Sequence, residues 1–420
     1  MRDSGSAMPI ADAERENIMS KPLGETVQQT EQLNPYRWVI LALMTACFLF
    51  TFIVRFSWPP LIPVVRPVLN MTAAQAGAYM SAFYFGYIIT QIPAGVLADR
   101  FGVRLILAAS LIIEGITTFL MGYITSYDTG FALRVITGLG AGAVYGACAR
   151  SLMEWFRPEE RGTAFGIMLA GPSGGILVAS FIMPPLNSWF GWQGAFQAVG
   201  LVTIVVGVII FLLVRSSDQT KTAGSMFAGF GIVFRSKETL LTALSGFCLM
   251  WVELGTATWA FAHIKQLGLE LKVAGTVMMF YGIGGILAPV ISGVISDLIG
   301  HRKWIYIIAL LVIAPVTVIF GAQTDVKMLC FIGFLFGFCS YFANPHLTIF
   351  ISEFAGKQFA ALANGSSNVI FQLAPVIGPW VMGWSIDITG ASSIVWWIMA
   401  LGPLVGIILM LPVNPENKRD

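Results

Sequence analysis

Long apolar stretches follow one another along most of the chain, and short polar segments separate them. A membrane-spanning helix needs about 20 mostly apolar residues. Stretches of roughly that length predict twelve transmembrane helices, with approximate bounds 37–57, 73–98, 104–124, 130–152, 162–184, 192–214, 239–264, 274–296, 303–322, 327–351, 358–384 and 392–412. We exclude membrane β-strands because the stretches lack two-residue alternation, whereas helices satisfy their backbone hydrogen bonds internally.

Composition strengthens the prediction of an integral membrane protein. Charged residues make up 11% of the chain, against about a quarter in soluble proteins, and the mean hydropathy is +0.78. The net charge of +2 favours no class of partner, and no basic stretch indicates nucleic-acid binding. The five cysteines lie inside apolar stretches without metal-ligand spacing, so we interpret them as packing residues and expect no metal or cofactor.

Polar segments divide the predicted helices into two halves. The longest internal one, 215–238, is interpreted as a cytoplasmic linker between an amino-terminal six-helix half, 37–214, and a carboxyl-terminal six-helix half, 239–412. We expect its apolar part, GSMFAGFGIVF, to form an interfacial helix. The segments 1–36 and 413–420 are interpreted as cytoplasmic tails, and the first lacks the basic start and short apolar core of a secretory signal.

The distribution of lysine and arginine predicts the orientation of the helices. Cytoplasmic loops of membrane proteins carry an excess of these residues. With the amino terminus inside, the inner loops hold Arg100, Arg104, Arg157, Arg161, Arg215, Lys221, Arg235, Lys237, Arg302, Lys303 and Lys357. The outer loops hold only Arg66, Lys265, Lys272 and Lys327. We therefore expect both termini in the cytoplasm and a multi-pass protein in the cytoplasmic (inner) membrane.

One short motif occurs twice, as GVLADRFGVR at 95–104 and as GVISDLIGHRK at 293–303. The copies follow the second and the eighth predicted helix, which are equivalent positions in the two halves. The shared residues are Gly95, Asp99, Gly102 and Arg104 in the first copy and Gly293, Asp297, Gly300 and Arg302 in the second. Identical intervals in equivalent loops indicate an internal duplication, which is typical of transporters.

Each shared residue type has a physical reason. We expect the first glycine of each copy to allow close helix contact and the second to adopt a positive φ in a tight turn. The aspartate ends its helix, where it can pair with arginine or cap the amino terminus of a neighbouring helix. The final arginine satisfies the excess of positive charge on the inner side.

The repeated motif resembles G-x-x-x-D-x-x-G-x-R/K, the signature loop of the major facilitator superfamily. Arg134 with Gly138, Trp155-Phe156 and Arg161-Gly162 resemble further patterns of that family. The resemblance implies an all-α fold of twelve helices and a monomer that works by alternating access, rocking two halves about a midplane site. We hypothesise that the two motif loops make contacts between the halves that stabilise the outward-facing state.

Three stretches resemble the organic-anion branch of that family, the anion:cation symporters: 83–104, 188–196 and 364–390. Two positions depart from the branch. An acidic residue often precedes the arginine of the first helix, but Val54 precedes Arg55 here. A glutamate often follows the arginine of the fourth helix by seven residues, and that position is Ala141. The resemblance implies a secondary transporter of a small organic anion, coupled to protons or to a counter-anion.

Ionisable residues inside predicted spans are costly and therefore candidates for function. We interpret Arg55 and Arg134 as substrate-binding, because guanidinium holds a carboxylate with two parallel hydrogen bonds. Arg134 could instead bond backbone carbonyls, and Arg55 could extend to the outer interface. Glu253 is the proton-coupling candidate, with a hydrogen bond between helices as the alternative. For Glu114, on a helix that the resemblance makes peripheral, we favour structural pairing.

Further polar residues lie at helical spacing on otherwise apolar stretches, which indicates that they face a cavity or another helix. His346 could bind substrate or take a proton, but a lone histidine is often a packing residue. The remaining substrate-binding candidates are Tyr84, Tyr87, Gln91, Tyr145 and Asn368.

Two other functions were considered. A proton-coupled drug or cation exporter of the same fold is the alternative, but its Gly-Pro-x-x-Gly-Gly motif is one residue short in Gly171-Pro172-Ser173-Gly174-Gly175. Such an exporter should also place acids in its cavity, whereas arginines predominate in the amino-terminal half. An enzyme or receptor is not expected, because no nucleophile–base pair, metal cluster or phosphate loop is visible.

Overall fold

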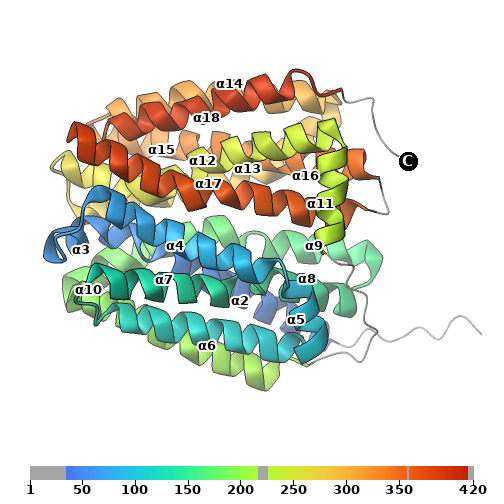
Figure 1. Cartoon of the computed structure of the whole chain (residues 1–420), viewed down its shortest axis with the longest axis horizontal. Helices are drawn as coiled ribbons and strands as arrows, with labels where there is room; N and C mark the ends of the chain where they lie inside the picture. Colours follow the sequence, from blue (N-terminus) through green and yellow to red (C-terminus); the bar gives the residue numbers. More distant parts are fainter. Residues whose placement is uncertain (1–34, 216–225, 357–358, 415–420) are drawn as a thin grey trace, which may run out of the picture. The chain divides into compact units, whose positions relative to one another are not determined.

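The helices of the chain follow from its apolar stretches, and Figure 1 shows their arrangement. The computed structural model describes residues 35–215, 226–356 and 359–414, which are almost entirely helical and contain no strand. The first helices are α2 (Tyr36–Phe56), the 3-10 turn η1 (Pro59–Leu61), α3 (Ile62–Val68), α4 (Ala73–Gln91), α5 (Ala94–Phe101), α6 (Val103–Met121), α7 (Tyr127–Ala141), α8 (Val144–Trp155), α9 (Pro158–Met168) and α10 (Gly171–Leu213). Those that follow are α11 (Met226–Arg235), α12 (Lys237–Gln266), α13 (Leu271–Ile299), α14 (Arg302–Ala322), α15 (Val326–Phe342), α16 (Asn344–Ala355), α17 (Ala360–Thr389) and α18 (Ile394–Met410).

Long apolar helices dominate the described residues. Nine helical stretches are long and apolar enough to cross a membrane, and α4 with α5 makes a tenth if that bent pair is one span. The stretch Glu159–Leu213 has 55 residues, more than the approximately 20 that one crossing needs. Each stretch predicted from the sequence contains a helix, so the prediction of a helical, multi-pass membrane protein is confirmed.

Several predicted helices are broken, which corrects their predicted bounds. The stretch 73–98 bends by 58° between α4 and α5, next to Pro93, which has no backbone N–H to donate. The stretch 130–152 breaks after Ala141, and 327–351 breaks at Ala343, two residues before Pro345. Residues 184–192, between the fifth and sixth predicted helices, are helical except at Gly191. The φ of Gly191 is 70°, a value that glycine adopts readily.

Of the predicted linker and tails, 1–34, 216–225 and 415–420 lie outside the described residues. Within the linker, a helix is present at Met226–Arg235, which covers most of the stretch 224–234 where one was expected. From Ile40 onward the chain forms one compact unit.

Glycines let α4 pack tightly against two other helices. A Cβ at Gly138 of α7 would overlap the backbone carbonyl of Phe83 in α4. On another face of α4, a Cβ at Gly77 would overlap the carbonyl of Pro379 in α17, and one at Gly383 would overlap that of Ala73. Small residues allow helix backbones to approach closely in membranes. The helices α4 and α17, far apart in sequence, therefore lie side by side (Figure 1).

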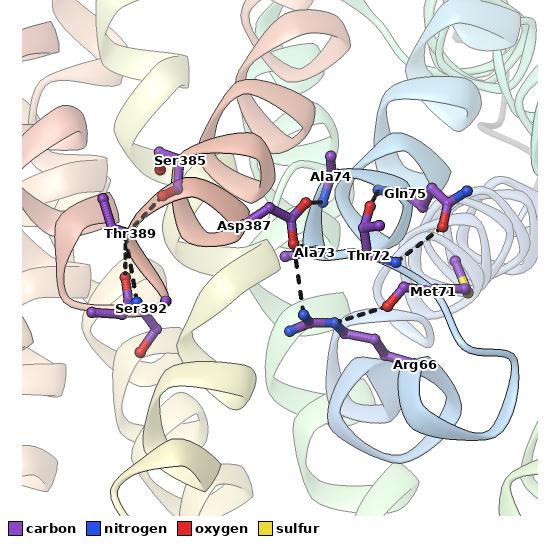
Figure 2. Close-up of polar contacts among 12 residues, drawn as sticks. Arg66, Met71, Thr72, Ala73, Ala74, Gln75, Ser385, Asp387, Thr389 and Ser392 are labelled. Carbon is purple, nitrogen blue, oxygen red and sulfur yellow. Dashed lines mark hydrogen bonds and ion pairs between the residues drawn. The ribbon is translucent and has the colours of Figure 1, made fainter.

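A carboxylate joins the same two helices at the start of α4, as Figure 2 shows. Asp387 of α17 accepts hydrogen bonds from the backbone N–H groups of Ala73 (2.7 Å) and Ala74 (2.8 Å). Its Oδ1 lies 3.7 Å from Nη2 of Arg66. The first N–H groups of a helix have no partner in the helix, and its dipole favours a negative charge there. We call this arrangement the Asp387 contact.

The packing of α4 against α7 generates a prediction. Gly138→Ala should force the two helices apart, because the new Cβ meets backbone rather than a movable side chain. Overpacking typically costs about 1–3 kcal/mol, so the purified variant should melt at a lower temperature. The control is Gly166→Ala in α9, where nothing lies within 4 Å of the added Cβ. Equal melting temperatures for wild type and Gly138→Ala would contradict this packing.

Candidate functional site

A ring of aromatic side chains encloses the guanidinium of Arg55, which is only 3% exposed. Its Cζ lies 4.2 Å from the ring centre of Phe52, 5.0 Å from those of Phe83 and Tyr84, and 4.7 Å from that of Tyr87. Cation–π contacts of this kind stabilise a buried positive charge. We call these five residues the Arg55 cage. Because the side chain of Arg55 is buried, it does not extend to the outer interface, which was the predicted alternative.

The cage leaves hydrogen-bond donors of Arg55 unused. Its Nε and Nη2 atoms are buried and have no hydrogen-bond partner among the described residues. Aromatic faces attract the charge but do not replace the hydrogen bonds that these donors would make in water. A buried donor without a partner costs about 1–3 kcal/mol, and more when it belongs to a charged group. The site is therefore suited to a small group that accepts hydrogen bonds and carries negative charge.

Arg134 uses its donors on the backbone. Its Nη2 donates to the carbonyl of Arg55 (3.2 Å) and its Nε to that of Tyr79 (3.4 Å). Its Cζ also lies 5.1 Å from the ring centre of Phe83. The sequence left open whether this residue binds substrate or backbone carbonyls, and the geometry is that of the second alternative. Arg134 connects α7 to α2 and α4 directly behind the cage.

The polar residues predicted on α4 face the interior together. Tyr84 and Tyr87 belong to the cage, and the hydroxyl of Tyr84 has no hydrogen-bond partner among the described residues. One turn further, Gln91 donates from Nε2 to Oδ1 of Asn368 in α17, at 2.7 Å. The ring centre of Tyr145 in α8 lies 5.9 Å from that of Phe48, which lies 4.9 Å from that of Phe52 in the cage. The structure therefore brings five of the predicted side chains, including Asn368, into one region beside Arg55.

Glu253 lies in a second polar cluster, in the carboxyl-terminal part of the chain. It is 2% exposed and accepts a hydrogen bond from Nδ2 of Asn344, at 2.9 Å. Asn344 is the first residue of α16, directly after the break that follows α15. Two tyrosines that sequence reasoning missed, Tyr281 and Tyr341, lie near Glu253, and their ring centres are 6.1 Å apart. Tyr341 also lies in the neighbourhood of Tyr84 of the cage.

Glu114 is completely buried on α6, at 0% exposure. Its Oε1 accepts a hydrogen bond from Oγ1 of Thr51 in α2 (3.0 Å), and its Oε2 has no partner among the described residues. A Cβ added at Gly140 would lie 3.3 Å from its Cγ. Glu114 therefore lies against the turn of α7 that contains Ala141. In the family branch that this sequence resembles, an acidic residue often occupies that position.

His346 lies apart from the cage. Its Nδ1 is 3.4 Å from the hydroxyl of Ser292, and its ring stacks on Phe342. Its electrostatic neighbour is Arg302 of the second motif copy. Its Nε2 is buried and has no hydrogen-bond partner among the described residues, so its predicted role in substrate or proton binding stays a prediction.

The motif residues make contacts within their own part of the chain. Asp99 forms an ion pair with Arg150 of α8, and Arg302 bonds Glu353 of α16 at 2.8 Å. The guanidinium of Arg104 lies over the ring of Phe211. The expected bridge between the two halves stays a prediction.

The motif glycines divide into two kinds. Gly102 and Gly300 have φ values of 80° and 74°, as the predicted tight turns require. The expectation of close helix contact at Gly293 is wrong, because a Cβ there would meet no atom within 4 Å. Gly95 lies inside α5, and the side chain of Asp297 lies outside the described set.

Known proteins with similar sequences are transporters. The chain is 25% identical to the probable sulfoacetate transporter SauU of Cupriavidus necator, with 90% of this chain and 94% of the relative covered. It is 24% identical to the probable galactarate/D-glucarate transporter GudP of Bacillus subtilis (82% and 87% covered). It is 23% identical to the 4-hydroxybenzoate transporter PcaK of Pseudomonas aeruginosa (85% and 89% covered).

Solved structures show the same fold. A bacterial homologue of the human lysosomal transporter Spinster, in an inward-facing and occupied conformation, superposes with a TM-score of 0.79 at 15% identity, covering 92% of this chain and 99% of the other. The nucleoside transporter NupG superposes with a TM-score of 0.75 at 15% identity, covering 89% and 99%. The family model of the Major Facilitator Superfamily matches residues 43–314 and 260–420. The chain therefore belongs to the Major Facilitator Superfamily, whose members are multi-pass membrane transporters and not enzymes.

Proposed function

We propose that this chain is a secondary transporter of a small organic anion, and that Arg55 binds the anion's carboxylate. The observation that carries the proposal is the buried guanidinium of Arg55, which has unused donors inside the cage. A carboxylate would accept hydrogen bonds from those donors and neutralise the charge. The relatives support this substrate class, because their names specify sulfoacetate, galactarate or D-glucarate, and 4-hydroxybenzoate.

Each neighbouring group has a role in this proposal. Arg134 fixes the backbone at Arg55 and adds positive charge, so it positions the binding residue rather than contacting the anion. The tyrosine hydroxyl of Tyr84 and the amides of Gln91 and Asn368 would bond polar groups of the substrate. Gln91 and Asn368 already bond each other, so a substrate that engages them would change a contact between distant parts of the chain. Tyr145 would contact the substrate's other end, and the role of His346 in substrate or proton binding stays a prediction.

The proposed topology has twelve membrane helices in two halves, 37–214 and 239–412, with both termini cytoplasmic and 215–238 as linker. The bent pair α4–α5 counts as one crossing, and the 55-residue stretch Glu159–Leu213 counts as two, separated at Gly191. α18 makes the last crossing. The excess of lysine and arginine in the inner loops supports the orientation in a cytoplasmic membrane, and we propose a monomer.

Alternating access is the proposed mechanism. In the proposed topology the Asp387 contact lies at the outer ends of α4 and α17, so it closes the outer side of the site. The motif pairs Asp99–Arg150 and Arg302–Glu353 lie at the inner side, each within one half. The closed outer side supports an inward-facing state here. Glu253 is the proposed proton carrier, and a counter-anion is the other possible driving species.

The exporter alternative is less well supported. A cationic substrate would have to bind beside the uncompensated guanidinium of Arg55. The buried acids Glu114 and Glu253 each already accept a hydrogen bond, from Thr51 and Asn344.

Substitution of Arg55 tests the proposed function. Arg55→Ala should weaken binding of the preferred acid by roughly 10- to 100-fold, since a hydrogen bond to a charged group contributes about 1.5–3 kcal/mol. Arg55→Lys should recover only part, because an ammonium lacks the planar fork. Thermal-shift titration with sulfoacetate, D-glucarate and 4-hydroxybenzoate, followed by uptake into proteoliposomes, measures both effects. Lys265→Ala, at an exposed cation, is the control. Unchanged affinity in Arg55→Ala, or stabilisation by cationic drugs alone, would refute the proposal.

The Asp387 contact predicts a change in the population of conformations. Asp387→Ala removes the acceptor for two N–H groups of α4, and loss of such a cap costs about 0.5–2 kcal/mol. The ratio of outward- to inward-facing molecules should rise by about 2- to 30-fold, measured as a distance between spin labels at Val68 and Ile388. Asp325→Ala is the matched control, because Asp325 caps its own helix through Met328. A distance distribution equal to that of the control would remove the proposed role.

A further inference from the structure

Glu114 is a buried acid that the proposed mechanism does not use. Both of its oxygens lie in the protein interior, yet only one is bonded: Thr51 donates to Oε1, and Oε2 has no partner among the described residues. A protonated Oε2 would instead be a donor rather than a second unbonded acceptor. The local structure therefore accommodates either charge state and does not hold the ionised form with a full set of donors.

Glu114 is close to the proposed anion site. Thr51, its hydrogen-bond partner, precedes Arg55 by four residues on α2, which places both on the same face of that helix. Glu114 interacts electrostatically with Arg55, although the structure records no ion pair between them among the described residues. The charge of Glu114 therefore acts on the cage without using the guanidinium donors of Arg55.

Other charged and titratable groups lie on the helices around Glu114. On α2, the groups near Glu114 are Arg55 and Cys47. α7 also carries Tyr127, Asp128 and Arg134, and α8 carries Tyr145, Cys148, Arg150 and Glu154, the last of which is bonded to Arg150. α10 contains no titratable residue, and the acid of α5, Asp99, is ion-paired with Arg150. Among these groups, Glu114 is the buried carboxylic acid with an oxygen that has no partner among the described residues.

The charges of this region match a particular substrate. Arg55 and Arg134 contribute two positive charges and an ionised Glu114 contributes one negative charge, so a single carboxylate leaves the region neutral. A substrate with two negative charges would leave one in excess, and an uncompensated buried charge is strongly destabilising. A proton on Glu114 removes that excess.

We propose that Glu114 is a proton-binding site linked to the anion site, and that it takes up one proton when a dianionic organic acid binds at Arg55. This inference rests on the proposed function and specifies its substrate class. The proton comes from water and forms one O–H bond at Oε2, while Thr51 continues to donate to Oε1. Because the anion and an ionised Glu114 repel each other, binding strengthens as pH falls.

Proton uptake on binding tests the proposal directly. Calorimetric titration of the full-length protein with D-glucarate or sulfoacetate, in buffers of different ionisation enthalpy, gives the number of protons taken up per anion. Wild type should take up about one, and its affinity should change by up to about tenfold per pH unit. Glu114→Gln retains an acceptor for Thr51 and should bind with almost no uptake and little dependence on pH. The control is Glu270→Gln, at an exposed acid, which should behave as wild type.

A second variant keeps the proposal testable if Glu114→Gln folds poorly. Thr51→Val removes the single donor to the carboxylate and keeps a side chain of similar shape. Proton uptake should persist, and the pH at which affinity changes should move upward, because the ionised acid loses its hydrogen bond. An unchanged pH profile in Thr51→Val would count against Glu114.

The outcomes separate this inference from the function on which it rests. If wild type binds none of the acids, the proposed function fails, and the inference fails with it. If wild type binds a dianion without proton uptake, anion transport stands and the inference is overturned. If uptake persists in Glu114→Gln and disappears in Glu253→Gln, the proton belongs to Glu253, and the inference is overturned as well.

Discussion

The hydrogen bonds from Arg134 to backbone carbonyls are the interaction on which the rest of the site depends. One guanidinium on α7 bonds the carbonyl of Arg55 on α2 and that of Tyr79 on α4. Because the acceptors are backbone atoms, the contact fixes helix positions rather than side-chain rotamers. The aromatic rings of α4 are thereby held against the end of α2, and they enclose the side chain of Arg55. Gly138, one turn along α7, lets the same helices approach closely.

The two arginines show how position changes the use of one chemical group. Arg134 satisfies its donors within the protein, whereas Arg55 is surrounded by rings that attract its charge but accept no conventional hydrogen bonds from it. The guanidinium of Arg134 therefore holds three helices together, whereas buried donors of Arg55 keep no hydrogen-bond partner among the described residues. The distinction lies in neighbours from α4 and α2 and not in either residue's own sequence context.

Local patterns predicted the helices and the polar side of α4, since both depend on periodicity along one segment. Tyr84, Tyr87 and Gln91 face the interior as their spacing indicated, and the turns at Gly102 and Gly300 follow from their residue type. Properties that depend on partners from other helices were not predictable. Glu114 is bonded to Thr51, which lies on the same helix as Arg55 of the cage. The helix that carries Glu114 was nevertheless expected to be peripheral. The opposite error occurred at Gly293, where a motif glycine has open space around it.

Direct backbone contact between α4 and α17 has a mechanical consequence. At Gly77 and Gly383 the two helix backbones are in direct contact. No flexible side chain lies between them that could change its rotamer when the helices shift slightly. Densely packed surfaces of this kind have few stable intermediate separations and tend to be either engaged or apart. Movement at this interface should therefore occur as a discrete step, and a partly opened interface should be short-lived. A partial separation of α4 and α17 is disfavoured by the shape of the helices themselves.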